Sequence, residues 1–173
     1  MKRFYITGVA GTGKSTIGRM LQAEGAAAFD IEDIPGLCMW QNKETGELTD
    51  RNDIGDRDAA FLAAHDWVCD AKALESHMGS YAKSPVIAVG VAANQKEYLH
   101  LFDQVFLLQC SDDVIVQRLK TRNTNDFGKT EAEQESVLGW RPYFEKALLE
   151  RGAIAVPNDL GSVKTVKRLL EFL

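Results

Sequence analysis

The chain carries, at residues 8–15, the stretch Gly8-Val9-Ala10-Gly11-Thr12-Gly13-Lys14-Ser15. This stretch fits the pattern Gly-x-x-x-x-Gly-Lys-Ser/Thr of the phosphate-binding loop, or Walker A motif. An apolar run, Phe4-Tyr5-Ile6-Thr7, precedes it, and the apolar residues Ile17, Met20 and Leu21 follow it at helical spacing. A strand before the loop and a helix after it are the context in which such a loop works.

Each residue type in this loop has a physical role. Glycine lets the backbone curl so that its N–H groups point inward around a phosphate, and the helix that begins near Lys14 adds free N–H groups and the positive end of its dipole. We expect Lys14 to reach the β- and γ-phosphates and the Ser15 hydroxyl to ligate magnesium. The expected nucleotide-binding set is Gly8, Ala10, Gly11, Thr12, Gly13, Lys14, Ser15 and Thr16.

Length and composition indicate one ordinary globular domain. The chain has 173 residues, of which 45% are hydrophobic and 26% charged, and its net charge is −5. An acidic chain offers no electrostatic surface for nucleic acid or for an anionic membrane, and no segment is long enough to span a bilayer. Three cysteines without ligand spacing indicate reduced thiols and a cytoplasmic protein, either a monomer or a homodimer.

The remaining pattern alternates strands with helices. We expect strands at about 3–8, 27–31, 86–91, 105–109 and 153–156, and helices at about 14–24, 58–77, 95–101, 113–122 and 131–150 (broken or kinked near Pro142). A final helix should place Val163, Val166, Leu170 and Leu173 on one stripe. Residues 35–57 are expected to be irregular, with a turn at 44–47. This alternation predicts a three-layer α/β/α fold around a five-stranded parallel sheet, in which functional residues follow the carboxyl ends of the strands.

The exit of the second strand is rich in acids. In Phe29-Asp30-Ile31-Glu32-Asp33, the side chains of Asp30 and Glu32 share one face of the extended chain. Asp30 could hold magnesium together with Ser15, or accept a proton from an attacking hydroxyl, and Glu32 or Asp33 could bind the acceptor. Acids also gather at strand exits simply because loops are solvated.

The third strand ends without an acid, in Ala92-Ala93-Asn94. Many phosphate-loop enzymes place a second magnesium carboxylate there, so we expect the metal to depend on Ser15 and Asp30. Gly90 either lets the chain pass close to a ligand or relieves packing.

Two arginines, Arg118 and Arg122, are spaced i and i+4 on the helix expected after the fourth strand, and a polar loop follows them. Phosphoryl transfer needs positive charge over the equatorial oxygens, which an arginine-bearing lid supplies while it excludes water. We therefore expect both arginines to be catalytic and residues 123–131 to form a lid loop. A solvated helix face is the alternative.

Together these features resemble the adenylate kinase and shikimate kinase group of small phosphate-loop kinases. The resemblance implies the sheet order 2-3-1-4-5, Mg²⁺ and ATP as cofactors, adenine stacked on Arg118, and phosphates contacted by Arg122. Asp30 matches the first acid of the shikimate kinase Asp-x-Asp pair, and the second acid here is Glu32. The Asp-Gly-x-Pro-Arg segment of adenylate kinases is missing after the third strand, which argues against a true adenylate kinase.

Residues 35–82 occupy the position of the acceptor site in that group, within the single domain 1–173. Glu32, Asp33, Trp40, Arg51 and Arg57 are the candidate acceptor-binding residues. An acceptor with its own phosphate would need an arginine there, whereas a neutral hydroxylated acceptor would rely on Asp30, Asp33 and an aromatic wall. Trp67 is expected to fill the core.

The sequence thus favours a kinase that transfers the γ-phosphoryl of Mg-ATP to a small nucleoside, nucleotide or hydroxylated metabolite. A GTPase-like switch or nucleotide sensor is the alternative. It is disfavoured because the nearest match to its guanine-binding pattern Asn-Lys-x-Asp, Asn42-Lys43-Glu44-Thr45, lacks the acid. A third possibility is a non-catalytic binding module for a partner protein.

Overall fold

The main sheet is parallel and has the strand order that the sequence predicts. The computed structural model describes residues 2–55, 57–82, 85–123 and 126–172. Its main sheet runs in the order β2-β6-β1-β7-β8, and every neighbouring pair is parallel. These strands are β1 (Arg3–Thr7), β2 (Ala27–Asp30), β6 (Val86–Val89), β7 (Gln104–Gln109) and β8 (Ile154–Pro157). Counted among themselves, they stand in the order 2-3-1-4-5.

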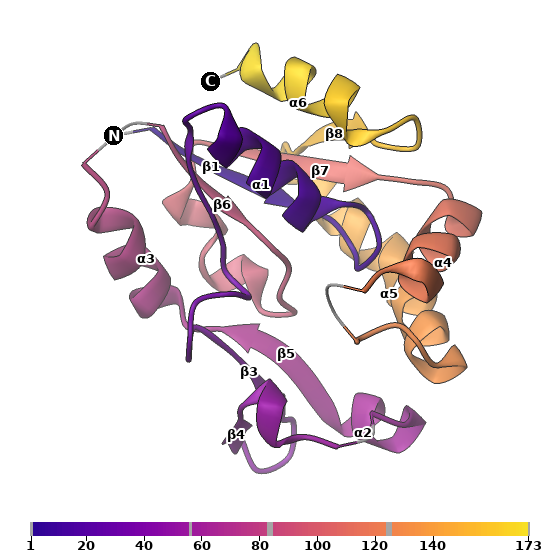
Figure 1. Ribbon diagram of the computed structural model, residues 1–173. Coiled ribbons are helices and arrows are strands. Elements are labelled where there is room, and N and C mark those ends of the chain that lie inside the picture. Colours follow the sequence, from indigo (N-terminus) through magenta and orange to yellow (C-terminus); the bar gives the residue numbers. More distant parts are fainter. Residues whose placement is uncertain (1, 56, 83–84, 124–125, 173) are drawn as a thin grey trace.

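Helices cover both faces of this sheet and give three layers. The helices are α1 (Lys14–Ala23), α2 (Ala59–Ala64), α3 (Ala71–Gly79), α4 (Asp112–Thr121), α5 (Glu131–Leu149) and α6 (Ser162–Leu170). Phe4 and Ile6 of β1 pack in the core with α1 and α6, whereas Tyr5 points into the opposite core with α3. This alternation is the one expected of a strand buried on both faces. In Figure 1, α1 lies in front of the sheet and α5 passes behind β7.

A second, antiparallel sheet lies at one end of the molecule (Figure 1). It has the order β4-β3-β5 and comprises β3 (Cys38–Asn42), β4 (Leu48–Thr49) and β5 (His65–Cys69). The expectation that residues 35–57 are irregular was therefore wrong. The turn at 44–47 is confirmed as the hairpin between β3 and β4, closed by hydrogen bonds between Asn42 and Glu47 and between Gly46 and Asn42.

The single helix expected at 58–77 was also wrong, because β5 interrupts it. Asp58 accepts a hydrogen bond from the Phe61 N–H and caps α2, and Asp70 does the same for Lys72 and Ala73 at the start of α3. Two N-cap residues twelve positions apart begin two helices. Between them, the residues of β5 pair with β3 along its whole length, so tertiary pairing overrides the helical spacing.

Three helical details differ from expectation. Residues 95–101 form two 3₁₀ turns, Gln95–Glu97 and Leu99–Leu101, in place of one helix. The α5 helix continues through Pro142 without a break, although the proline removes the hydrogen bond to the carbonyl four residues earlier, and the kink expected as the alternative stays a prediction. In α6, Val163 is 60% exposed and the buried stripe consists of Thr165, Val166 and Leu169, which face α1 and the sheet. Leu173 lies outside the described residues. Within the described ranges, no helix is long and apolar enough to cross a membrane.

Candidate functional site

The phosphate loop curls at three glycines whose backbone conformation other residues rarely adopt. Gly8, Gly11 and Gly13 have φ angles of 155°, 87° and 96°. A β-carbon at Gly8 would lie 2.6 Å from the Leu108 carbonyl oxygen and 2.7 Å from the Thr12 Oγ1. Thr12 in turn donates through Oγ1 to the Val9 carbonyl at 2.8 Å. Bonds within the loop thus hold its curl, which suits it to receive phosphate oxygens.

The Lys14 ammonium is buried inside this curl. Its Nζ donates to the Val9 carbonyl oxygen at 3.1 Å, and the residue is 7% exposed. Burial lowers the pKa of Lys14, although the charges of Glu32 and Asp30 oppose that shift. A desolvated cation with one carbonyl partner is stabilised strongly by an anionic ligand, so the loop fits a polyphosphate.

The side chains of Ser15 and Asp30 meet at the edge of the loop. Ser15 Oγ donates to Asp30 Oδ2 at 2.7 Å, and Asp30 Oδ1 accepts from the Glu32 N–H at 3.0 Å. Burial raises the pKa of Asp30. A hydroxyl and a carboxylate are the oxygen ligands that magnesium prefers. Within the described residues no group of three or more His, Cys, Asp or Glu side chains could hold a metal, so an ion at Ser15 and Asp30 would take further ligands from phosphate and water.

Glu32 faces the same space, whereas Asp33 does not. Burial raises the pKa of Glu32, and the positive charges of Lys14, Arg122 and Arg51 oppose that shift. The Asp33 side chain is exposed, and its backbone N–H closes the turn by donating to the Asp30 carbonyl at 3.2 Å. Of the three acids at this exit, the structure brings Asp30 and Glu32 to the phosphate loop.

Arg118 braces the phosphate loop from α4. Its Nη1 lies 3.4 Å from the Thr12 carbonyl oxygen and 3.2 Å from Cys110 Sγ, and its Nη2 donates to the Asn158 carbonyl at 2.8 Å. These bonds lie in the plane of the guanidinium. Its flat faces therefore remain suitable for stacking on a base.

Arg122 is the residue directly after α4, and it holds the α4–α5 connection, residues 122–130. Its Nη2 donates to the Phe127 carbonyl oxygen at 2.6 Å, and burial lowers its pKa. Its Nε is buried without a hydrogen-bond partner in the part of the chain that the structure describes. A buried unsatisfied donor beside Glu32 and Lys14 suits a phosphate oxygen. Residues 124 and 125 of the expected lid loop lie outside the described residues.

Arg57 does not stand free in the acceptor region. Its Nε donates to Glu133 Oε1 at 2.7 Å, and its Nη2 lies 3.3 Å from Asp126 Oδ1. Glu133 is 2% exposed and also accepts from the N–H groups of Gly128 and Thr130, at 2.8 and 3.2 Å. The segment before α2, the α4–α5 connection and α5 thus meet at one buried carboxylate.

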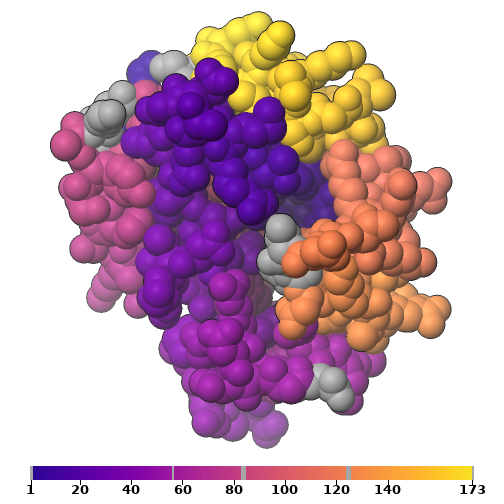
Figure 2. All heavy atoms as spheres, viewed as in Figure 1, coloured from indigo at the N-terminus to yellow at the C-terminus, as the bar shows by residue number. Residues whose placement is uncertain are grey.

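Trp40 lies in an aromatic cluster beside this junction. Its ring centroid is 5.2 Å from Phe61, 5.4 Å from Trp67 and 6.4 Å from Phe127. The cluster joins the second sheet to the α4–α5 connection. Arg51 is exposed on the 3₁₀ turn Arg51–Asp53. Figure 2 shows the indigo N-terminal segment, the purple second sheet and the orange α4–α5 segment side by side on one face.

Gly90 serves packing. A β-carbon there would lie 2.3 Å from Ile31 Cγ1, and the φ of Gly90 is +150°.

Asn94 fastens the second sheet to the main one. It follows the third strand of the main sheet, at the position where many phosphate-loop enzymes carry an acid. Its side chain accepts from the Cys69 N–H and donates to the Cys69 carbonyl, both at 2.9 Å.

Sequence reasoning missed Asn158 and Glu133. Asn158 follows β8 and is 1% exposed, and its Nδ2 donates to the Thr12 carbonyl oxygen at 2.8 Å. The rule that functional residues follow strand ends applies to β8 as well and would have singled it out. Glu133 stands three residues after Thr130 in a capping box, and that spacing is legible in the sequence.

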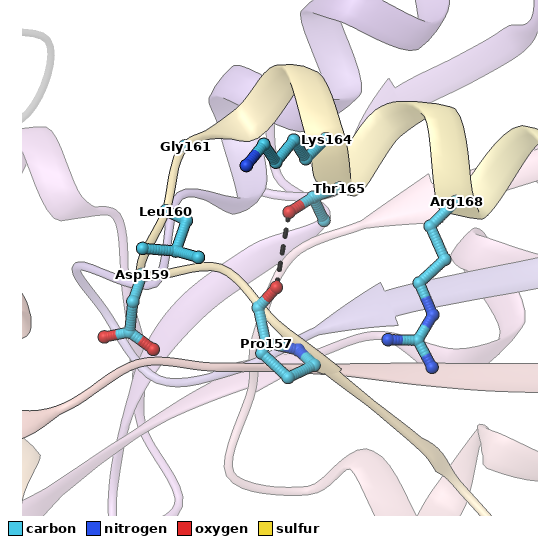
Figure 3. Close-up of a pocket in the computed structure, with 7 residues that line it drawn as sticks. All are labelled: Pro157, Asp159, Leu160, Gly161, Lys164, Thr165 and Arg168. Carbon is cyan, nitrogen blue, oxygen red and sulfur yellow. Dashed lines mark hydrogen bonds between the residues drawn. The ribbon is translucent and has the colours of Figure 1, made fainter.

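A surface cavity of about 300 Å³ opens on the other side of Asn158, between β8 and α6. Figure 3 shows the side chains that line it, with the Thr165 hydroxyl directed at the Pro157 carbonyl. Thr165 also donates to Asn158 Oδ1 at 2.7 Å. The cavity is thus separated from the phosphate loop by the pair Asn158–Thr165.

The sheet order and the phosphate loop define a phosphate-loop nucleotide-binding protein. Residues 5–139 match the family model of an AAA domain, and the chain belongs to that family. None of the curated proteins compared with the chain matches it.

Solved structures share the fold at low identity. A shikimate kinase from Acinetobacter baumannii, in complex with shikimate, is 18% identical with a TM-score of 0.62, over 99% of this chain and 92% of that one. A sugar kinase from Janibacter sp. is 19% identical with a TM-score of 0.54, over 99% and 93%. A deoxyadenosine kinase from M. mycoides is 16% identical with a TM-score of 0.53, over 98% and 97%. The kinase-like fold is thereby shown.

Proposed function

We propose that this protein is an ATP-dependent kinase that transfers a phosphoryl group to a small hydroxylated acceptor. The observation that carries the proposal is the 2.7 Å hydrogen bond between Ser15 and Asp30 at the mouth of a formed phosphate loop. It sets a metal-binding hydroxyl and a carboxylate beside the buried Lys14 ammonium. The structural likeness to three small-molecule kinases supports the same reaction class.

Each part of the site has an assigned task in this proposal. Lys14 and the N–H groups of residues 8–16 bind the triphosphate, and Arg118 offers a face to the base. Magnesium, held by Ser15 and Asp30, would screen the negative charge of the phosphates. Arg122 neutralises charge over the transferred group, and the connection that it holds excludes water as a lid.

The acceptor occupies the space between Asp30, Glu32 and the second sheet. Asp30 and Glu32 orient the acceptor hydroxyl, and either carboxylate can take its proton because both stand at the loop. Residues 35–82 form the acceptor-binding region, with Trp40 as part of its wall. Asp33 and Arg51 are exposed and contribute at its rim.

An ADP-release assay with Mg-ATP tests the proposal over a panel of nucleosides, nucleotides, sugars and hydroxy acids. We expect at least one acceptor to raise turnover above the acceptor-free rate, and Lys14→Ala to abolish that increase. Lys167→Ala, at an exposed position on α6, is the matched control. If no acceptor in the panel stimulates ADP release, the kinase proposal is wrong.

A further inference from the structure

Of the two arginines in the acceptor region, Arg57 is held by carboxylates, and Arg51 is exposed at the rim. Arg57 is bonded to Glu133 at 2.7 Å and lies 3.3 Å from Asp126. Burial alone would lower the pKa of Arg57, but the Glu133 hydrogen bond and the charges of Asp126 and Glu133 raise it above its ordinary value. A guanidinium that already has two carboxylate partners gains little from another anion.

Two further arginines near the phosphate loop lie close enough to carboxylates to be influenced by their charge. The positive charge of Arg51 acts to lower the pKa of Glu32. The negative charges of Glu32, Glu133 and Asp126 act to raise the pKa of Arg122. Five acids and four bases are linked by such interactions among the described residues, which are Asp30, Glu32, Asp33, Asp126 and Glu133, and Lys14, Arg51, Arg57 and Arg122. Since magnesium does not cancel the whole charge of a triphosphate, nucleotide binding leaves the cleft with net negative charge.

One side of the acceptor region is formed by aromatic side chains. Trp40, Trp67, Phe61 and Phe127 lie in one cluster beside the Arg57–Glu133 pair. The indole Nε1 of Trp67 is buried without a hydrogen-bond partner among the residues that the structure describes. An aromatic wall of this kind binds the face of a ring.

Building on the proposed kinase function, we infer that the acceptor is an uncharged, ring-containing hydroxyl compound, such as a nucleoside or a neutral sugar, and that Glu133 sets this preference by neutralising Arg57. Nucleoside monophosphates and hydroxy acids are then excluded by charge. Glu133 acts here as a specificity residue through Arg57 and makes no contact with the acceptor itself.

Matched neutral and anionic acceptors test the inference in the full-length protein. The pairs are deoxycytidine and its 5′-monophosphate, glucose and glucuronate, and the methyl ester of shikimate and shikimate. For the pair that gives the fastest turnover, we expect kcat/KM to favour the neutral member by at least tenfold. A smaller ratio, or a preference for the anion, overturns the inference while leaving the kinase function intact.

Glu133→Gln gives the sharper measurement, because glutamine retains the N-terminal cap of α5 and removes the charge that faces Arg57. We expect this variant to lower the neutral-to-anionic ratio at least tenfold, and Arg57→Gln in the same background to restore it. Glu135→Gln, which removes a carboxylate at an exposed position on the same helix, is the control and should change the ratio less than threefold. An unchanged ratio in a folded Glu133→Gln protein contradicts the inference.

If no member of the panel is phosphorylated, the kinase proposal is wrong, but the inferred preference for a neutral ligand can still be tested by binding. Calorimetry with the nonhydrolysable ATP analogue AMPPNP and magnesium then compares the same pairs. Tighter binding of the neutral member supports the inference, and equal, reversed or undetectable binding of both members overturns it. Calorimetry likewise replaces turnover if Glu133→Gln is too unstable to assay at length.

Discussion

The phosphate loop and the second sheet differ in how the chain specifies them. The loop is local: Gly8, Gly11 and Gly13 set its curl, and Lys14 and Ser15 follow within two positions. The second sheet is assembled from β3 and β5, which are separated in sequence by α2, and it is fastened to the main sheet by Asn94. A motif of neighbouring residues can be recognised in a sequence, whereas the pairing of strands that lie far apart in the chain cannot. Changes in the loop should therefore abolish function, and changes in the second sheet should redirect or destabilise it.

Lys14→Ala should have the largest effect. Removing the buried ammonium eliminates the cation that the phosphates contact, so we expect a loss of acceptor-stimulated ADP release of about 10³-fold. Circular dichroism should show an intact fold, since an unpaired buried charge is not needed for stability. Near-normal turnover in this variant would show that the loop is not the nucleotide site.

Glu32→Gln separates function from stability. Burial raises the pKa of Glu32, so the native state holds its proton more tightly than the unfolded state does. Between the ordinary and the raised pKa, stability therefore falls as pH rises, and at neutral pH the ionised carboxylate is destabilising. We expect Glu32→Gln to raise the Tm at pH 7 while lowering kcat/KM about 10²-fold. A lower Tm would contradict the assignment of the shift to burial.

The pH dependence of kcat/KM in the wild-type protein should reflect the same raised pKa values. Because burial raises the pKa of Asp30 and of Glu32, both carboxylates become protonated at a higher pH than exposed ones do. We expect the fall of kcat/KM on acidification to begin at a higher pH than the one at which ordinary carboxylates titrate. The acid limb should move in Glu32→Gln, and an unmoved limb would show that Glu32 does not control it.

Trp40→Ala tests the second sheet. Trp40 is 8% exposed and contacts three aromatic rings, so we expect a loss of about 3–5 kcal/mol in the free energy of unfolding. At a temperature where the variant is folded, the KM for the acceptor should rise and the Kd for Mg-ATP should stay within about twofold. Equal weakening of both ligands would show that the two regions are not separable.

Gly139→Ala should have the smallest effect and serves as the reference. Gly139 lies inside α5, and an added β-carbon there would meet no neighbouring atom within 4 Å, so alanine should add about 1 kcal/mol of stability. Neither nucleotide nor acceptor kinetics should change. A kinetic change in this variant would mean that stability itself alters the assay, and the other variants would then need correction for it.

Much of the main sheet follows from its sequence because buried parallel strands are continuous apolar runs flanked by helical spacing. Val86–Val89 and Gln104–Gln109 lie where the pattern places them, within two residues. His65–Cys69 does not, because its residues fit a helical face equally well and only the partner strand β3 decides between the two.

Part of the candidate site could also be predicted from the sequence. The phosphate-loop motif singled out Ser15, and Asp30 and Glu32 were singled out because strand exits meet at one edge of a parallel sheet. Arg57 was expected to be available to the acceptor, and its pairing with Glu133 could not be foreseen because the two residues lie 76 positions apart. Contacts of that range depend on how the second sheet docks, which no local pattern encodes.

The most direct test of the account is a calorimetric titration of the protein with ATP in the presence of magnesium. The account predicts saturable binding with one nucleotide per chain, at least tenfold weaker in Lys14→Ala and unchanged in Lys167→Ala. Absence of binding by both ATP and GTP to the folded wild-type protein would contradict it.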